Sequence, residues 1–133
     1  MAYLFDTDQV IDALADHPQV RGLIEHLRSQ GVAMSLISYM EAYQGVLADR
    51  STVHVSAKFD ELLGVLEIVP FSTATARICA NLRADLTARG RRVRPRALDL
   101  MTAATALEHG LTLVTRNTAD FADIPGLRLY AWA

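Results

Sequence analysis

Residues 97–117 read ALDLMTAATALEHGLTLVTRN, and this stretch indicates the architecture of the whole chain. Residues 97–108 are rich in alanine and predict a helix. Gly110, shortly after them, is the usual C-terminal signal of a helix. The apolar residues 111–115 that follow predict a short buried strand. A helix that leads so quickly into a buried strand is typical of proteins that alternate the two elements around a parallel sheet.

The rest of the chain repeats this alternation of helices and short apolar strands. Further helices are predicted at residues 7–14, 19–29, 38–48, 53–66 and 73–88, and further strands at residues 2–5, 32–35, 68–71 and 127–132. Thr7 is expected to cap the first helix, and Ser38 with Glu41 forms a capping-box pattern at the start of the third. The sequence therefore predicts an α/β fold in which helices cover both faces of a mostly parallel sheet.

The size and composition of the chain set limits on its class. It has 133 residues, 51% of them hydrophobic and 21% charged, so we expect a single globular domain over residues 1–133 and no extensive disorder. Cys79 is the one cysteine, so neither an internal disulfide nor a cysteine-based zinc site can form, and a reducing, cytoplasmic setting is expected. The N-terminus lacks the basic region of a signal peptide, and the longest uncharged stretch, residues 29–40, is too short to span a membrane.

The basic residues are unevenly distributed. A net charge of −2 argues against a simple basic nucleic-acid binder, and Lys58 is the only lysine, which disfavours mechanisms that need a catalytic lysine. Five arginines lie within eight residues: Arg89, Arg91, Arg92, Arg94 and Arg96. Because the planar guanidinium donates paired hydrogen bonds to phosphate, this segment is either a contact for a polyanionic substrate such as RNA or a solvated loop.

Four acidic residues, far apart in the sequence, are predicted to meet at the carboxyl edge of the sheet: Asp6, Glu41, Asp99 and Asp120. Taken singly, each has a local explanation at a helix start or turn, where acids are favourable. Four carboxylates in one pocket repel each other, and hard cations such as Mg²⁺ or Mn²⁺ relieve that repulsion through oxygen ligands. Two such ions are the usual arrangement for hydrolysis of a phosphodiester, so the pattern favours a metal-dependent nuclease.

The motifs around these acids resemble those of PIN-domain ribonucleases, specifically the VapC-type toxins of toxin–antitoxin pairs. The similarity extends over essentially the whole chain. It is carried by YLFDT at residues 3–7, SYME at 38–41, DLMTAATALEHG at 99–110 with LVTRN at 113–117, and DF at 120–121 with IPGL at 124–127. The last two segments, in their order and spacing, are the most specific part of the resemblance.

This resemblance implies a fold, an activity and a set of partners. It implies a PIN-like three-layer α/β/α sandwich and an endoribonuclease toxin that uses Mg²⁺ or Mn²⁺. Asp6, Glu41, Asp99 and Asp120 would then be the catalytic, metal-binding acids. Hydrogen bonds from Thr7, Thr115 and Asn117 would hold these acids or nearby waters in place. The expected partners are a cognate VapB-like antitoxin that blocks the site, a second copy of the chain in a homodimer, and a toxin–antitoxin hetero-oligomer.

The chain departs from the family pattern at Asp8, where PIN-domain proteins usually have asparagine. This residue leaves a second enzyme class open, because Asp6 and Asp8 together fit the opening D-x-D motif of haloacid-dehalogenase-like phosphatases. Asp6 would then be the nucleophile and Asp8 the general acid and base, with Asp120 and Asp123 imitating the distal acid pair of that class. Lys58 is poorly placed in the sequence for this chemistry. The third possibility is a catalytically inactive PIN-like module that only binds RNA or a partner.

Overall fold

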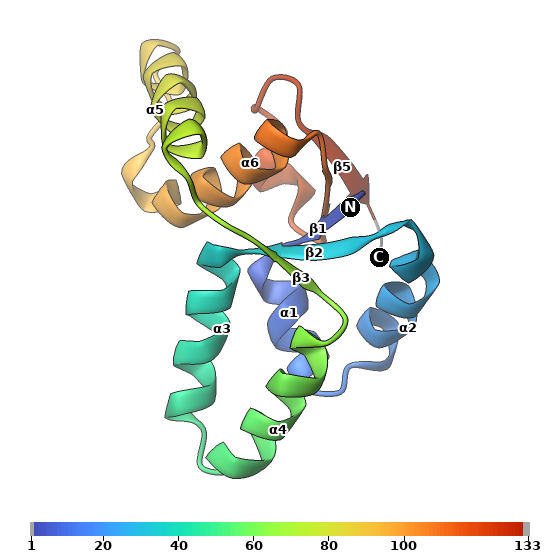
Figure 1. The fold of residues 1–133 in the computed structure, drawn as a ribbon. Helices are drawn as coiled ribbons and strands as arrows, with labels where there is room; N and C mark the ends of the chain where they lie inside the picture. The colour runs from blue at the N-terminus through green and yellow to red at the C-terminus, as the bar shows by residue number, and fades with distance from the viewer. Residues whose placement is uncertain (1, 132–133) are drawn as a thin grey trace.

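The alternating elements build one parallel sheet in the computed structural model, which describes residues 2–131. Its strands are β1 (Tyr3–Phe5), β2 (Val32–Ser35), β3 (Glu67–Val69), β4 (Thr112–Thr115) and β5 (Arg128–Ala131). They lie in the order β3-β2-β1-β4-β5, and all four neighbouring pairs are parallel. The predicted parallel sheet is therefore confirmed (Figure 1).

The strand order reverses its direction at β1. From β1 the chain adds β2 and then β3 on one side, and it returns to add β4 and β5 on the other. Leu4 of β1 is consequently paired with Ala33 on one side and with Leu113 on the other. Ligands in open parallel sheets bind outside the carboxyl ends of the strands at such a switch point. The ends of β1 and β4 are therefore the place to look for a site.

Helices cover both faces of the sheet and complete the expected three-layer sandwich. On one face lie α1 (Thr7–Leu14), α2 (Pro18–Leu27), α3 (Leu36–Ala48) and α4 (Thr52–Leu63), and on the other lie α5 (Thr73–Ala88) and α6 (Ala97–His109) (Figure 1). Three short 3-10 helices connect elements: η1 (Arg28–Gln30), η2 (Arg94–Arg96) and η3 (Thr118–Phe121). None of the helices within residues 2–131 has the length and apolar character needed to cross a membrane.

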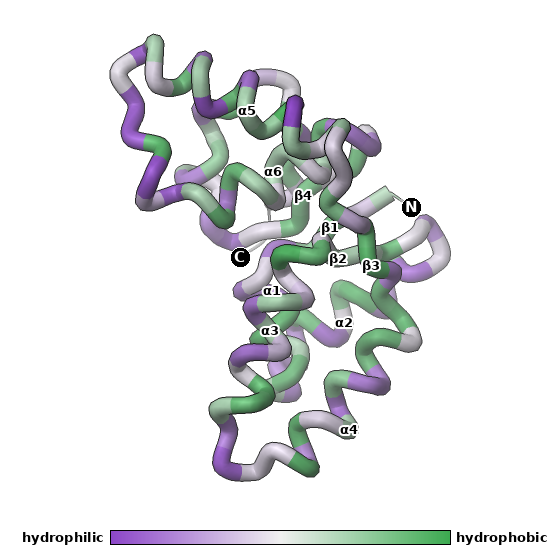
Figure 2. Tube along the Cα trace, turned by 60° about the vertical axis from the view of Figure 1, so that its left-hand side comes forward, coloured by the Kyte–Doolittle hydropathy of each residue, from purple (hydrophilic) through white to green (hydrophobic). Residues whose placement is uncertain are grey.

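Each face of the sheet has its own hydrophobic core. Leu4, Leu100 and Leu113 belong to the cluster beneath α5 and α6, whereas Phe5, Met34 and Val114 belong to the cluster beneath α1 to α4. Neighbouring residues of one strand thus enter opposite clusters, as the two-residue period of a strand requires. Figure 2 accordingly shows the central strands as largely hydrophobic.

Some element boundaries differ from those predicted. The strand expected at residues 68–71 is β3, Glu67–Val69, because Pro70 has no N–H to continue the ladder. The helix expected to reach residue 66 ends at Leu63, where Gly64 caps it, and the helix expected from residue 19 begins at Pro18. The last strand ends at Ala131, and Trp132 lies outside the described residues.

The two predicted helix caps are wrong in a way that matters for function. Asp6, not Thr7, caps α1, since its side chain accepts a hydrogen bond from the Thr7 amide. Ser35, not Ser38, caps α3, and its Oγ accepts from the Ser38 amide at 3.0 Å. The hydroxyl of Thr7 and the carboxylate of Glu41 therefore have no capping role and remain available to each other.

Candidate functional site

The first strand ends in a buried carboxylate. Asp6 follows β1 directly and is only 5% exposed. One of its oxygens accepts from the Thr7 amide at 2.8 Å, and the other accepts from the Thr115 hydroxyl at 3.0 Å. Because Thr115 ends β4, this second hydrogen bond joins the two strands at the switch point.

The electrostatic surroundings of Asp6 disfavour its charge. Burial raises the pKa of Asp6 from its ordinary value of 3.8 to about 6, although the hydrogen bonds from Thr115 and Thr7 lower it in part. The negative charges of Asp99 and Asp8 raise it further. A carboxylate that is both buried and close to other carboxylates gains from a cation nearby.

A second carboxylate lies on the next element. Glu41 is half-buried in α3, and it accepts a hydrogen bond from the Thr7 hydroxyl at 2.7 Å. The same hydroxyl is 2.9 Å from Ser38 Oγ. Thr7 thus contacts Asp6 through its amide and Glu41 through its side-chain hydroxyl.

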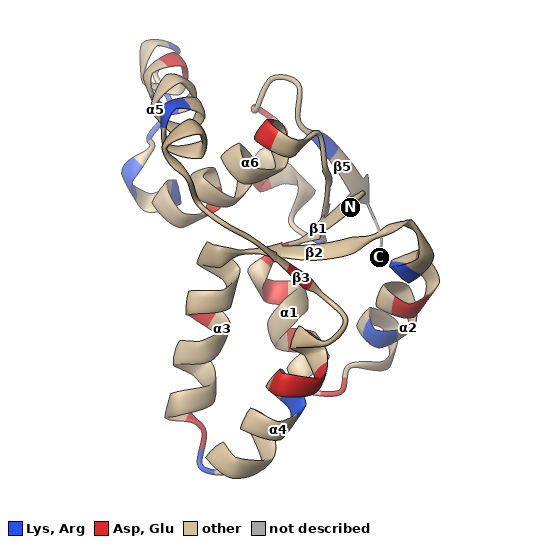
Figure 3. Ribbon diagram, in the orientation of Figure 1, with Lys and Arg blue, Asp and Glu red and all other residues tan. Residues whose placement is uncertain are grey.

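Asp99 interacts electrostatically with each of the other predicted acids. It lies half-buried in the first turn of α6, and burial raises its pKa above the ordinary value. The charges of Glu41, Asp120 and Asp8 raise that pKa further, whereas Arg96 lowers it. Carboxylates from three other segments therefore lie within electrostatic reach of Asp99, namely those of Asp6 and Asp8, of Glu41, and of Asp120. Figure 3 shows acidic positions on α1 and α3, two of the elements that contribute to this group. Asp120, on η3, is the exposed member of this group.

A row of buried hydroxyls beneath the acids was not predicted. Ser35 Oγ lies 3.2 Å from both Ser38 Oγ and Thr102 Oγ1, and this row continues through Ser38 to Thr7. All of these side chains are buried, so the hydroxyls satisfy one another away from water. The sequence signal was the position of Ser35 at the end of a strand and directly before a helix, which also marks an N-cap.

Asn117 and Asp8 form a pair at the rim. The Asn117 side-chain amide donates to an Asp8 carboxylate oxygen at 3.0 Å, and both residues are exposed. The backbone amide of Asn117 donates to the Thr115 hydroxyl, which in turn donates to Asp6. The unusual aspartate at position 8 is therefore engaged by the residue predicted to organise the acids.

The arginine-rich segment divides into two groups. Arg89, Arg91 and Arg96 all contact Asp123, through its backbone carbonyl or its carboxylate. Within residues 2–131, the side chains of Arg92 and Arg94 form no ion pair or hydrogen bond. Arg92 lines a recess of about 290 Å³ beside Asp120, and Arg94 lines one of about 350 Å³ beside Glu41 and Asp99. Arg92 and Arg94 therefore each line a recess that one or more of the four acids also line.

The donor chemistry suits a hard cation. In the part of the chain that the structure describes, no three side chains of the ligating types converge closely enough to form a ready-made metal cage. Mg²⁺ needs no such cage, because it binds through one or two carboxylates and completes its shell with waters and substrate phosphates. The carboxylate oxygens of Asp6 and Asp99, whose ionised forms are disfavoured without a counter-charge, meet that requirement.

The phosphatase alternative finds no support in this geometry. Lys58 forms an ion pair with Asp16, which lies just after the C-terminal end of α1, whereas Asp6 precedes its N-terminal end. Asp123 is paired with Arg96, so it is not a free acid beside Asp120. The lysine and the distal acid that the phosphatase chemistry needs are therefore both engaged elsewhere.

Comparison with known proteins agrees with the site. The PIN domain family matches residues 3–127. Ribonuclease VapC2 of Rickettsia felis is 31% identical over 134 residues, covering 99% of this chain and 98% of that protein. The tRNA(fMet)-specific endonuclease VapC of Salmonella typhimurium is 27% identical, covering 99% of this chain and 98% of that protein.

Solved structures extend the similarity to the fold. VapBC2 from Rickettsia felis, bound to a DNA fragment from its promoter, contains a chain with a TM-score of 0.91 and 30% identity, covering 100% of both chains. DNA-bound VapBC from Salmonella typhimurium gives a TM-score of 0.90 at 28% identity, covering 100% of this chain and 99% of the other. The chain therefore belongs to the PIN-domain family, as a ribonuclease of the VapC type.

Proposed function

We propose that this chain is an endoribonuclease toxin in which Asp6, Glu41, Asp99 and Asp120 hold Mg²⁺ or Mn²⁺ at the carboxyl edge of the sheet. The observation that supports the proposal is the electrostatic grouping of Asp99 with carboxylates from three other segments. A divalent ion bound there would neutralise charge on the phosphodiester and activate water for attack. Membership in the VapC ribonucleases supports RNA as the substrate.

The chain's own side chains prepare this centre before any ligand arrives. Thr115 and the Thr7 amide hold the two oxygens of Asp6, and the Thr7 hydroxyl holds Glu41. These contacts fix two carboxylates at the switch point, so little side-chain freedom is lost when a cation and a phosphate bind. The buried hydroxyl row behind them excludes bulk water from one side of the site.

The partner of this toxin is an antitoxin of the VapB class. The two solved structures described above are VapBC complexes, and this supports a hetero-oligomer in which the antitoxin blocks the acidic site. We further infer that the toxin forms a homodimer within that assembly. Cys79 is buried and unpaired, which suits the reducing cytoplasm.

A parallel cleavage assay tests the function directly. Purified, antitoxin-free protein is incubated with total RNA and with Mg²⁺ or Mn²⁺, in the presence and absence of EDTA. Discrete fragments that disappear with EDTA are expected, and mapping their ends identifies the target. Intact RNA under every condition, from protein shown to bind the metal, would instead support a binding-only module.

The exchange Asp8→Asn separates the two enzyme classes. We expect it to leave RNA cleavage within about threefold of wild type, because asparagine is usual at this position in the family and Asp8 is exposed at the rim. The amide of an asparagine can still pair with Asn117. If Asp8 were a general acid, its loss would cost on the order of 100-fold or more in rate. Cleavage is compared at equal protein concentration, beside hydrolysis of a phosphomonoester.

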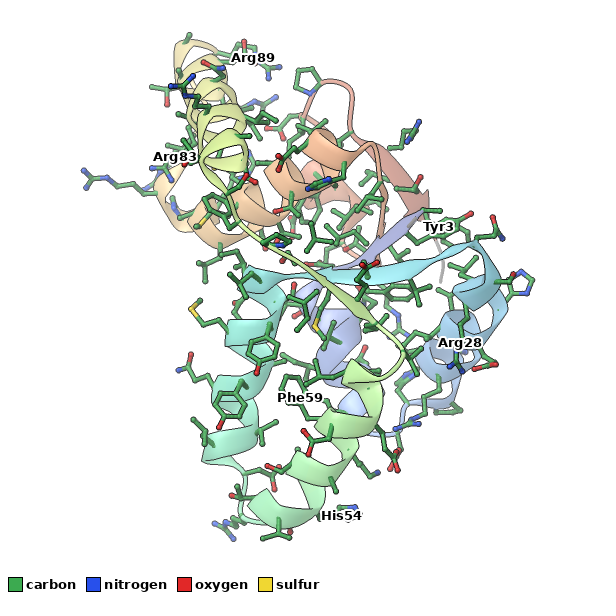
Figure 4. The ribbon with its side chains drawn as sticks, in the orientation of Figure 1. Tyr3, Arg28, His54, Phe59, Arg83 and Arg89 are labelled. Atoms are coloured by element: carbon green, nitrogen blue, oxygen red, sulfur yellow. The ribbon has the colours of Figure 1, made fainter. Side chains whose placement is uncertain are left out.

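The two unpaired arginines are expected to contribute most of the segment's RNA affinity. Replacing both Arg92 and Arg94 with alanine should weaken RNA binding and reduce the slope of log affinity against log salt by about 1 to 2. The turnover number should change little, because neither side chain contacts a carboxylate of the site. Arg83→Ala, which removes a half-buried arginine of α5 outside this segment (Figure 4), is the control. An unchanged salt slope in the double variant would make the segment a solvated loop.

A further inference from the structure

Arg96 connects the start of α6 with the segment that carries Asp120. Its side chain is 22% exposed, and its Nη1 and Nη2 atoms donate to the two carboxylate oxygens of Asp123 at 2.9 and 2.7 Å. The same Nη2 donates to the backbone carbonyl of Asp120 at 2.8 Å. The Asp123 side chain is 18% exposed. This geometry is a paired, partly buried contact of the strong, charge-assisted type.

The η3 segment is held from inside by buried apolar side chains and from outside by arginines, among them Arg89, which donates to the Asp123 carbonyl at 3.0 Å. A 3-10 turn is short, and its hydrogen bonds have poorer geometry than those of an α-helix. Within it, the Asp120 amide donates to the Asn117 carbonyl at 3.0 Å, and Phe121 is buried in the core. Phe121 therefore anchors the inner side of the turn. On the outer side, the Asp120 carbonyl is held by Arg96.

We propose that Arg96 and Asp123 form a clamp that holds Asp120 near Asp99, so that Arg96 is a positioning residue and not an RNA ligand. The inference rests on the proposed function, because Asp120 matters for catalysis only if the acidic cluster binds metal. Arg96 and Asp99 lie one helical turn apart at the same end of α6. A contact from Arg96 to η3 therefore fixes the position of Asp120 relative to Asp99.

The chemistry of the guanidinium suits this clamp. Its planar fork holds both oxygens of the Asp123 carboxylate and still directs one nitrogen at the Asp120 carbonyl. The compact ammonium group of a lysine presents no such fork, so it cannot make the same contacts. Both terminal nitrogens of Arg96 are engaged, whereas Arg92 and Arg94 line recesses and form no ion pair or hydrogen bond within residues 2–131.

Two substitutions break the clamp from opposite sides, and Mn²⁺ alone serves as the first probe. Arg96→Ala and Asp123→Asn should each weaken Mn²⁺ binding, measured by isothermal titration calorimetry, by roughly 10-fold to 100-fold. The turnover number should fall in parallel, with the KM for RNA nearly unchanged. Arg96→Lys should weaken Mn²⁺ binding less than Arg96→Ala does, but more than the control does. Arg28→Ala, which removes an exposed ion pair with Glu25 (Figure 4), is the control and should match wild type.

A direct role of Arg96 in RNA binding makes the opposite prediction. Arg96→Ala would then raise KM at constant turnover, and Asp123→Asn, which frees the guanidinium, would leave KM unchanged or lower it. That pattern would overturn the clamp. A double-mutant cycle sharpens the comparison, because Asp123→Asn should cause no further loss of Mn²⁺ affinity in an Asp120→Asn background. An equal loss in both backgrounds would also overturn it.

Failure of the clamp and failure of the proposed function give different results. If Asp120→Asn weakens Mn²⁺ binding but Arg96→Ala and Asp123→Asn do not, the clamp is wrong and the function stands. If the wild type neither binds Mn²⁺ nor cleaves RNA, the function is wrong. Hydrogen exchange still tests the clamp in that case, since Asp123→Asn should speed exchange of the amides of residues 118–121. Exchange of these amides at the wild-type rate would contradict the clamp as well.

Discussion

Replacing Asp99 with asparagine is expected to reduce RNA cleavage by about 1,000-fold while the protein stays folded. Burial raises the pKa of Asp99, and the charges of Glu41, Asp120 and Asp8 raise it further, so Asp99 interacts with every other segment of the cluster. Asparagine has the same shape but carries no charge and binds a hard cation more weakly. The measurement is the initial rate of RNA cleavage with saturating Mg²⁺, beside a circular dichroism spectrum.

An exposed aspartate supplies the control for this experiment. Asp60→Asn changes an exposed carboxylate on α4 and should leave cleavage at the wild-type rate. Loss of activity in both variants would point to contamination or instability rather than to the site. A folded Asp99→Asn protein that cleaves RNA at the wild-type rate would contradict the assignment of the metal-binding acids.

Replacing Asp6 with asparagine is expected to abolish cleavage and yet to stabilise the metal-free protein by up to about 3 kcal/mol at pH 8. Burial raises the pKa of Asp6 from 3.8 to about 6, so the ionised side chain is less favourable in the folded than in the unfolded chain. Asparagine removes that unfavourable charge. It also caps a helix as well as aspartate does, so α1 keeps its start.

The free energy of unfolding that Asp6→Asn adds should depend on pH. Above about pH 6, Asp6 is ionised in both the folded and the unfolded chain, so the buried charge destabilises the folded wild type to its full extent. As the pH falls from 6 to 4, the folded wild type binds its proton first and becomes more stable relative to the unfolded chain. The difference between variant and wild type should therefore be largest above pH 6 and should disappear near pH 4.

Urea unfolding at several pH values measures this difference, with EDTA present to remove metal ions. Adding Mg²⁺ should stabilise the wild type more than Asp6→Asn, because a ligand of the folded state raises its stability by mass action. This second readout does not depend on RNA cleavage. A variant that is less stable than wild type at pH 8, or a difference that grows toward pH 4, would contradict the role of burial at Asp6.

The order and type of the elements could be predicted because they depend on local patterns. The helix predicted at residues 73–88 has the bounds of α5, and the two buried strands predicted at residues 32–35 and 111–115 are β2 and, within one residue, β4. Their period and their Gly signals are contained in neighbouring residues. Cap assignments failed at Thr7 and Ser38, because several adjacent hydroxyls and carboxylates could each serve as the cap.

The functional residues were predictable to a different degree. The sequence could predict that the four acids lie near one another, because a parallel sheet brings the carboxyl ends of its strands to one edge. The division of the arginine-rich segment into paired and unpaired side chains could not be predicted, because Asp123 pairs with Arg96 across 27 positions in the chain. Nothing near residue 96 in the sequence distinguishes this arginine from Arg92 or Arg94.

Local sequence patterns were enough to predict the alternating elements, the parallel sheet and the acids near its edge, because these depend on periodicity and on residue type. Only the tertiary structure decided which hydroxyl holds which carboxylate and which arginines remain unpaired. The Thr115 hydroxyl reaches Asp6 across 109 positions, and the Thr7 hydroxyl reaches Glu41 across 34. Such hydrogen bonds act over about 3 Å, so they depend on how the packed layers meet and not on separation along the chain.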